Sequence, residues 1–183
     1  MSDLIVQPLA EALLACLCEA VQEQANPPQN CCLRVGTEVA ADMDVFRDLC
    51  CEGLAYVALG DQWVSVNSFP EQDIVRQANT QCGIGAWAVE LKVGIMRCVP
   101  TGTNNEMPTC TEWTAAAINN IADAKSLRRA ACCFIAYLRE APLLEGLSVV
   151  VNRQIQAPVQ GGCTERSMSI SVQIPNCDCP PLI

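Results

Sequence analysis

The sequence predicts an α+β domain in which two long helices pack on one face of about four mostly antiparallel strands. Three observations lead to this fold class. Apolar residues recur at helical spacing in two long segments, and they alternate with polar residues in several shorter ones. Short connections between half-buried strands favour antiparallel pairing. With 51% hydrophobic and only 4% aromatic residues, the core must be aliphatic, and residues 1–183 are expected to form one domain.

The first helix is predicted over residues 4–24, where leucines and valines recur every three or four positions. Asn26-Pro27-Pro28 should end it, because proline lacks the N–H that a helix interior needs. The second helix is predicted over residues 109–138. Thr109 and Glu112 match a capping box, in which each side chain satisfies a backbone N–H of the other residue.

Four strands are predicted. Residues 50–59 should form one that stops at a turn at Gly60-Asp61, and Trp63 to Val66 are a candidate extension of the sheet beyond that turn. Residues 86–99 give the clearest signal, because Trp87, Val89, Leu91, Val93 and Ile95 alternate with polar residues. Residues 147–155 and 167–174 are the remaining two strands.

Residues 31–48 are predicted to form a surface loop with little regular structure. The loop is acidic, and a solvated surface is the favoured interpretation. Asp42 and Asp44 alone are too few oxygen ligands for a metal site. The acidic residues of this loop are Glu38, Asp42, Asp44 and Asp48.

The charge and composition exclude several functions. The net charge is −9, so phosphate backbones should be repelled and ordinary nucleic-acid binding is not expected. The chain has no histidine, which removes the commonest general base and the commonest metal ligand. The N-terminus is acidic and the apolar runs are short, so neither a secretory signal nor a membrane span is expected. We therefore expect the protein to be synthesised in the cytoplasm.

Fourteen cysteines are an unusual number for such a chain. No two of them have the two to four intervening residues that are typical of zinc and iron–sulfur sites, so no metal is expected. Some should be small buried hydrophobic residues, and Cys16, Cys132 and Cys133 occupy apolar helix positions that fit this role. Others should form disulfides after the protein leaves a reducing compartment, with a pairing that the sequence does not give. The candidates are Cys31, Cys32, Cys50, Cys51, Cys163, Cys177 and Cys179.

Catalytic motifs are missing. No glycine-rich phosphate loop follows a strand, and no serine has a histidine partner. Cys110, in the first turn of the second helix, is the one thiol placed to be activated, but a structural role is the favoured interpretation. We therefore expect no catalytic, cofactor-binding or metal-binding residues, and no enzyme.

Several motifs resemble proteins from the head–tail region of long-tailed actinobacteriophages (siphoviruses). They are Cys-Cys-Leu-Arg-Val-Gly at 31–36, Asp-Leu-Cys-Cys-Glu-Gly-Leu-Ala-Tyr-Val at 48–57, Trp-Ala-Val at 87–89, Met-Arg-Cys-Val-Pro-Thr at 96–101 and Met-Pro-Thr at 107–109 with Glu112-Trp113. Further along come Asp123, Arg-Arg-Ala at 128–130 with Cys132-Cys133, Gln-Gly-Gly-Cys at 160–163 and Cys-Asp-Cys at 177–179. The chain most resembles the tail terminators.

This resemblance implies a structural virion protein at the head–tail junction. Tail terminators form a ring, here expected to be a hexamer, that caps the tail tube, stops polymerisation of the major tail protein and offers a docking surface to the connector or stopper of the neck. DNA would only pass through the lumen, which the acidic loop at 38–48 could face, and disulfides would form once the virion leaves the cell. Ring contacts could use edge strands, by β-augmentation, and the loops at 67–83 and 100–108.

Two alternatives stay open. The first is a head-to-tail connector or stopper, which occupies the next ring of the same virion. The second belongs to another class, a cysteine-based redox or metal-binding protein.

Overall fold

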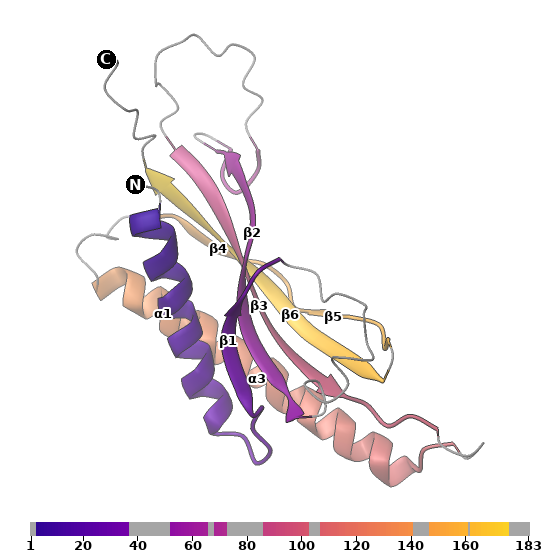
Figure 1. The fold of residues 1–183 in the computed structure, drawn as a ribbon. Helices are drawn as coiled ribbons and strands as arrows, with labels where there is room; N and C mark the ends of the chain where they lie inside the picture. Colours follow the sequence, from indigo (N-terminus) through magenta and orange to yellow (C-terminus); the bar gives the residue numbers. More distant parts are fainter. Residues whose placement is uncertain are drawn as a thin grey trace, which may run out of the picture.

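The computed structural model describes residues 3–36, 52–65, 68–72, 86–102, 107–140, 147–160 and 162–175. Within these residues the chain forms two helices and a six-stranded sheet (Figure 1). The elements in chain order are α1 (Asp3–Gln22), β1 (Asn30–Arg34), β2 (Leu54–Val64), β3 (Ala86–Cys98), α3 (Cys110–Glu140), β4 (Val149–Val151), β5 (Ile155–Gln156) and β6 (Cys163–Pro175).

The sheet has the strand order β1-β2-β3-β6-β4, and β5 also pairs with β6. All pairs are antiparallel except β1 with β2, which is parallel. The predicted α+β class is therefore confirmed, but the expected four strands were too few and the sheet is mixed. The additional strand β1 lies in the segment predicted to be a loop. It is five residues long and has no clear alternation of apolar residues, so its pairing depends on tertiary contacts.

The two helices lie side by side on one face of the sheet (Figure 1). Leu9, Leu13 and Leu17 of α1 and Phe134 of α3 are each fully buried in the core between the helices and the strands. The strands contribute their aliphatic side chains to the same core. Burial of such side chains stabilises the fold by roughly 1.5 to 3 kcal/mol each relative to exposure.

The centre of the sheet is the long antiparallel pair of β3 and β6, in register from Ala86–Pro175 to Cys98–Cys163. The alternation predicted for β3 is confirmed, because Val89, Leu91 and Ile95 lie in the core beneath the helices.

The single strand predicted over residues 147–155 is instead two short strands, β4 and β5. Two other strand boundaries also differ from the prediction. The turn expected at Gly60-Asp61 is a β-bulge, where the register with β3 shifts between Leu59 and Gln62, and β2 continues to Val64. Strand β6 starts at Cys163 rather than near residue 167, because its first residues pair with the end of β3. In both places a neighbouring strand supplies hydrogen bonds that the local sequence does not predict.

Helix α1 is more apolar than the sequence analysis expected. The window Ile5–Gln22 has a mean hydropathy of 1.4, so by length and composition alone it could cross a membrane. In the structure one side of this helix packs on the sheet and on α3. Two disulfides also attach it to its neighbours, Cys16–Cys133 to α3 and Cys18–Cys31 to β1.

Candidate functional site

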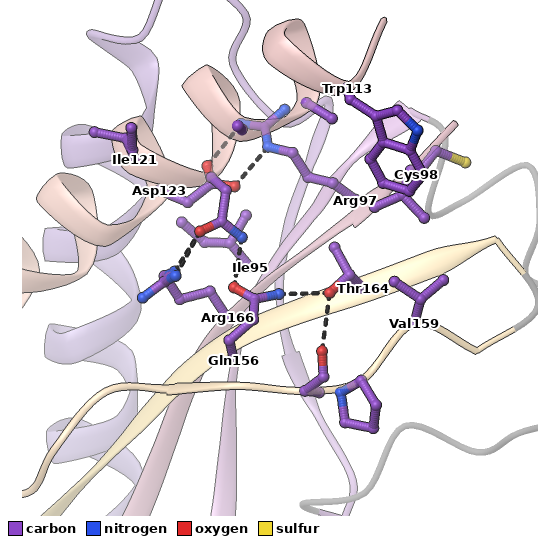
Figure 2. A pocket seen from close by; sticks show the side chains of 16 residues that line it. Ile95, Arg97, Cys98, Trp113, Ile121, Asp123, Gln156, Val159, Thr164 and Arg166 are labelled. Carbon is purple, nitrogen blue, oxygen red and sulfur yellow. Dashed lines mark hydrogen bonds and ion pairs between the residues drawn. The ribbon is translucent and has the colours of Figure 1, made fainter. Parts of the chain in front are cut away.

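A groove of about 550 Å³ lies between the first half of α3 and the ends of the central strands (Figure 2). Trp113 and Ile121 of α3 form one wall, and Val159, which follows β5, forms the opposite wall. Their side chains are 45%, 70% and 51% exposed, respectively. Large apolar side chains that remain this exposed around a hollow are typical of a surface that binds another molecule.

The groove exists because α3 is longer than the surface that it covers. In Figure 1 the first turns of α3 extend past the end of β3. No side chain of residues 110–122, all of which the structure describes, is buried. Ile118, on the same stretch, is 60% exposed. The length and apolar content of this half of the helix are therefore not explained by the core of a single chain.

A buried ion pair lies at the inner end of the groove. Arg97 of β3 donates from Nε and from a terminal nitrogen to the two carboxylate oxygens of Asp123, at 2.7 and 2.8 Å. Gln24 accepts a further hydrogen bond from Arg97 at 2.6 Å and donates to Asp123 at 3.1 Å. Asp123 is 2% exposed and Arg97 is 9% exposed. Such a paired carboxylate is a poor general base, because its lone pairs already accept hydrogen bonds.

A second polar chain follows the floor of the groove (Figure 2). Arg166 donates from Nε to Oδ1 of Asn120 at 2.9 Å, and Asn120 donates in turn to Gln156. Gln156 donates to the hydroxyl of Thr164, which donates to the carbonyl of Ala157 at 3.1 Å. These side chains bind one another, so the walls offer mainly apolar contact to an incoming partner.

A third cluster lies on the sheet face opposite the helices. The hydroxyl of Tyr56 donates to Glu165 at 2.6 Å, and Lys92 forms an ion pair with the same carboxylate oxygen at 2.8 Å. The guanidinium of Arg34 lies 5.2 Å from the centre of the Tyr56 ring, within cation–π range. A Cβ at Gly94 would lie 2.8 Å from that ring, so only glycine fits opposite it.

Tyr56 is 1% exposed. Burial, together with the negative charge of Glu165, raises the pKa of its hydroxyl well above the ordinary value. A phenol that stays protonated and donates to a carboxylate stabilises the sheet, and it does not supply a nucleophile at neutral pH.

The disulfide candidates separate into three groups. Cys31 is bonded to Cys18, and Cys163 is also disulfide-bonded. Cys32, by contrast, is a free and exposed thiol, so the prediction for this residue was wrong: its side chain points to the sheet face opposite Cys31, away from α1. The remaining candidates, Cys50, Cys51, Cys177 and Cys179, lie outside the described residues.

Of the three cysteines expected to be buried on the helices, Cys16 is buried in the core, whereas Cys132 and Cys133 are exposed. Cys16 and Cys133 are bonded to each other between α1 and α3, and Cys132 is an exposed free thiol. Helical periodicity did not separate Cys132 from Cys133, which point about 100° apart around the helix. Only the position of α1 decides which one is within reach of Cys16.

The remaining site predictions concern reactive groups. Cys110 is an exposed free thiol at the start of α3. Over the part of the chain that the structure describes, no three His, Cys, Asp or Glu side chains come together as metal ligands. The acidic loop with Glu38, Asp42, Asp44 and Asp48 lies outside that part.

Sequence reasoning missed the groove and its ion pair. A signal for the pair was present, because Arg97 ends an apolar strand and Asp123 interrupts an apolar helix stripe. Buried charges need partners, so two such residues are candidates to meet. Nothing in the sequence indicates how far α3 extends beyond the sheet.

A search of family models finds no match to this chain, and a search of curated proteins finds none either.

Proposed function

We propose that this chain is a structural subunit of a larger protein assembly, and that the assembly is the tail of a long-tailed bacteriophage. In this role it is a tail terminator, which forms a ring on the tail tube, stops polymerisation of the tube and receives the neck proteins. The resemblance of its motifs to actinobacteriophage head–tail proteins supports the choice of assembly. The exposed first half of α3 supports a role as a building block.

That half of α3 is the observation that carries the proposal. Trp113 and Ile121, which line the groove, and Ile118 on the same half of the helix are 45 to 70% exposed. Covering the exposed part of each in a contact would contribute roughly 1 to 2 kcal/mol. A subunit that is completed by its neighbours leaves such side chains uncovered while it is alone.

The buried polar groups also support a structural role. The buried acids Asp123 and Glu165 are both held in ion pairs, with Arg97 and Lys92. Because these pairs are closed, they stabilise the subunit and are not arranged for acid–base chemistry. The net charge of −9 suits a ring through which DNA slides without adhering.

Electron microscopy of particles assembled without this chain tests the proposal. A terminator is needed to stop the tube, so overlong tails unattached to heads are expected, and supplying the chain in trans should restore normal particles. Full heads that lose their DNA would indicate the connector or stopper instead. Particles with normal tails would contradict both.

A variant connects this test to the groove. Ile121→Asn should fail to restore normal particles although the protein stays folded, because it places a polar side chain in the contact. Tyr137→Ser is the matched control, since Tyr137 is also an exposed apolar residue of α3, at 41%, but lies outside the groove lining.

Thiol counting and metal analysis of the reduced protein test the redox or metal-binding alternative. A stoichiometric bound metal would support that alternative.

A further inference from the structure

The two outer edges of the sheet are different surfaces. Strand β1 lies at one edge, and β4 with β5 lies at the other. No strand among the described residues pairs with the outer side of either. An open strand edge exposes backbone N–H and C=O groups that can pair with another chain.

At the β1 edge, the N–H of Asn30 donates inward to the carbonyl of Gly53 at 3.2 Å. Successive residues of a strand turn their backbone groups to opposite sides, so Cys31 and Leu33 turn theirs outward. The side chain of Leu33 is 44% exposed, and that of Val35, just after the strand, is fully exposed. This edge therefore combines outward-facing backbone groups with exposed apolar side chains.

The opposite edge has the same combination. Asn152 donates inward to the carbonyl of Ser169 at 2.9 Å, which turns the backbone groups of Val151 outward. The side chains of Val151 and Ile155 are 39% and 52% exposed. Gln154, between β4 and β5, attaches this edge to α3 by donating to a backbone carbonyl of the helix at 3.0 Å.

Acidic side chains prevail beside one edge and basic side chains beside the other. The basic residue of β1 itself, Arg34, lies over the Tyr56 ring on the sheet face opposite the helices. Helix α1, which a disulfide attaches to β1, contains no basic residue, and its Glu11 is exposed. Glu52, exposed beside β1, adds a second negative charge. Beside the other edge, Arg128 of α3 and Arg153 are exposed.

We propose that a second copy of this chain binds head to tail, with the β1 edge and α1 of one copy against the β4–β5 edge and α3 of the next. This assignment rests on the proposed function, because it takes the neighbour to be the next subunit of the ring. β1 and β4 run in opposite directions within the sheet, so a continued sheet pairs them antiparallel.

In such a continued sheet the helices of both copies lie on the same face. The acidic α1 of one copy then faces the basic side of α3 of the next, and complementary charges fix the pairing. Because the two edges differ, the contact is heterologous, leaves one edge of each kind free at the ends and closes when the rotation completes a ring.

Charge reversal tests the arrangement on the full chain. The variant Glu11→Lys with Glu52→Lys makes both edges basic, and Arg128→Glu with Arg153→Glu makes both acidic. Each should weaken self-association on the order of ten-fold at low salt in sedimentation experiments. An equimolar mixture of the two variants should restore it, because unlike copies can then alternate. Unchanged association of either variant, or no recovery in the mixture, would overturn the proposal.

Cross-linking gives an independent readout that also captures transient contacts. The chain has only two lysines, Lys92 and Lys125, so Arg153→Lys adds a carbodiimide-reactive amine while keeping the charge. When isotopically heavy and light copies are mixed, cross-links between copies are expected from position 153 to Glu11 or Glu52. Lys92, paired with Glu165 on the other sheet face, is the internal control. Absence of the expected cross-links, alone and on tail tubes, would overturn the proposal.

The particle assay separates this inference from the proposed function. If charge-reversed copies that no longer associate still produce normal tails, the edge assignment is wrong and the terminator role stands. If the cross-links form but particles without the chain have normal tails, the edge assignment stands and the terminator role is wrong.

Discussion

The two halves of α3 share one helix and one type of sequence, but they belong to different environments. Residues 123–140 include every buried side chain of the helix, among them Leu127, Phe134 and Leu138. Residues 110–122 bury none, although Trp113 and Ile121 are as apolar as the residues that follow. Apolar periodicity therefore identifies an apolar helix face. It does not tell how much of that face the core of the same chain covers.

The two halves should differ most in how much their apolar side chains contribute to the free energy of unfolding. Phe134→Ala removes a fully buried ring and should lower the free energy of unfolding by about 3 to 5 kcal/mol. Ile121→Ala, at a residue that is 70% exposed, should lower it by about 0.5 kcal/mol or less. Urea unfolding of both variants measures this. Equal losses would mean that the first half is covered within the single chain.

The disulfides also distinguish the two halves of α3, because the Cys16–Cys133 bond attaches the second half to α1. Replacing Cys16 and Cys133 together by alanine removes a cross-link between residues that are 117 positions apart. Replacing Cys18 and Cys31 removes one between residues that are 13 positions apart. Loop-closure entropy predicts that the first pair contributes about 2 kcal/mol more than the second. Thermal or urea unfolding of the two double variants checks this, and the reverse order would count against the entropic account.

The smallest effect is expected at the start of the first half. Glu112 accepts hydrogen bonds from the N–H of Thr109 at 2.7 Å and from its hydroxyl at 2.8 Å, and the Glu112 N–H donates back at 3.3 Å. The backbone hydrogen bond above all, then the hydroxyl, holds the pKa of Glu112 below its ordinary value of 4.5. The carboxylate therefore stabilises the first turn fully above pH 4.5, and this contribution is lost as the pH falls through the lower folded-state pKa.

Amide hydrogen exchange across this pH range measures the effect. Exchange in the first turn of α3 should accelerate at low pH, beyond the intrinsic trend, while the second half stays protected. Glu112→Gln should remove most of this pH dependence, since it keeps a side-chain acceptor without the charge. A variant with the same pH response as the wild type would show that the capping box does not titrate as described.

Local chemistry explains what was predicted well. The proline pair after α1, the capping box at Thr109 and the alternation in β3 each act through neighbouring residues, so the sequence carries them directly. The predicted boundaries of the two helices and of β3 lie within about two residues of the observed ones, which is ordinary for helix and strand ends.

The failures share a different cause. β1 is a strand because β2 lies beside it, and the bulge at Gly60-Asp61 is not a turn because β3 continues to pair past it. Arg97 and Asp123 meet although they are far apart in the chain, so neither residue could be assigned a partner in advance. Each of these features depends on a contact between distant segments.

The sequence by itself determined the class of fold, the positions of both helices and the absence of histidine chemistry, because these follow from composition and from spacing along the chain. Only the tertiary structure decided which cysteines pair, which half of α3 stays exposed and where the groove forms. Cys132 and Cys133 illustrate the reason: they are neighbours in sequence, but only Cys133 lies within bonding distance of Cys16. Distances between separate elements are set by packing, which local spacing does not specify.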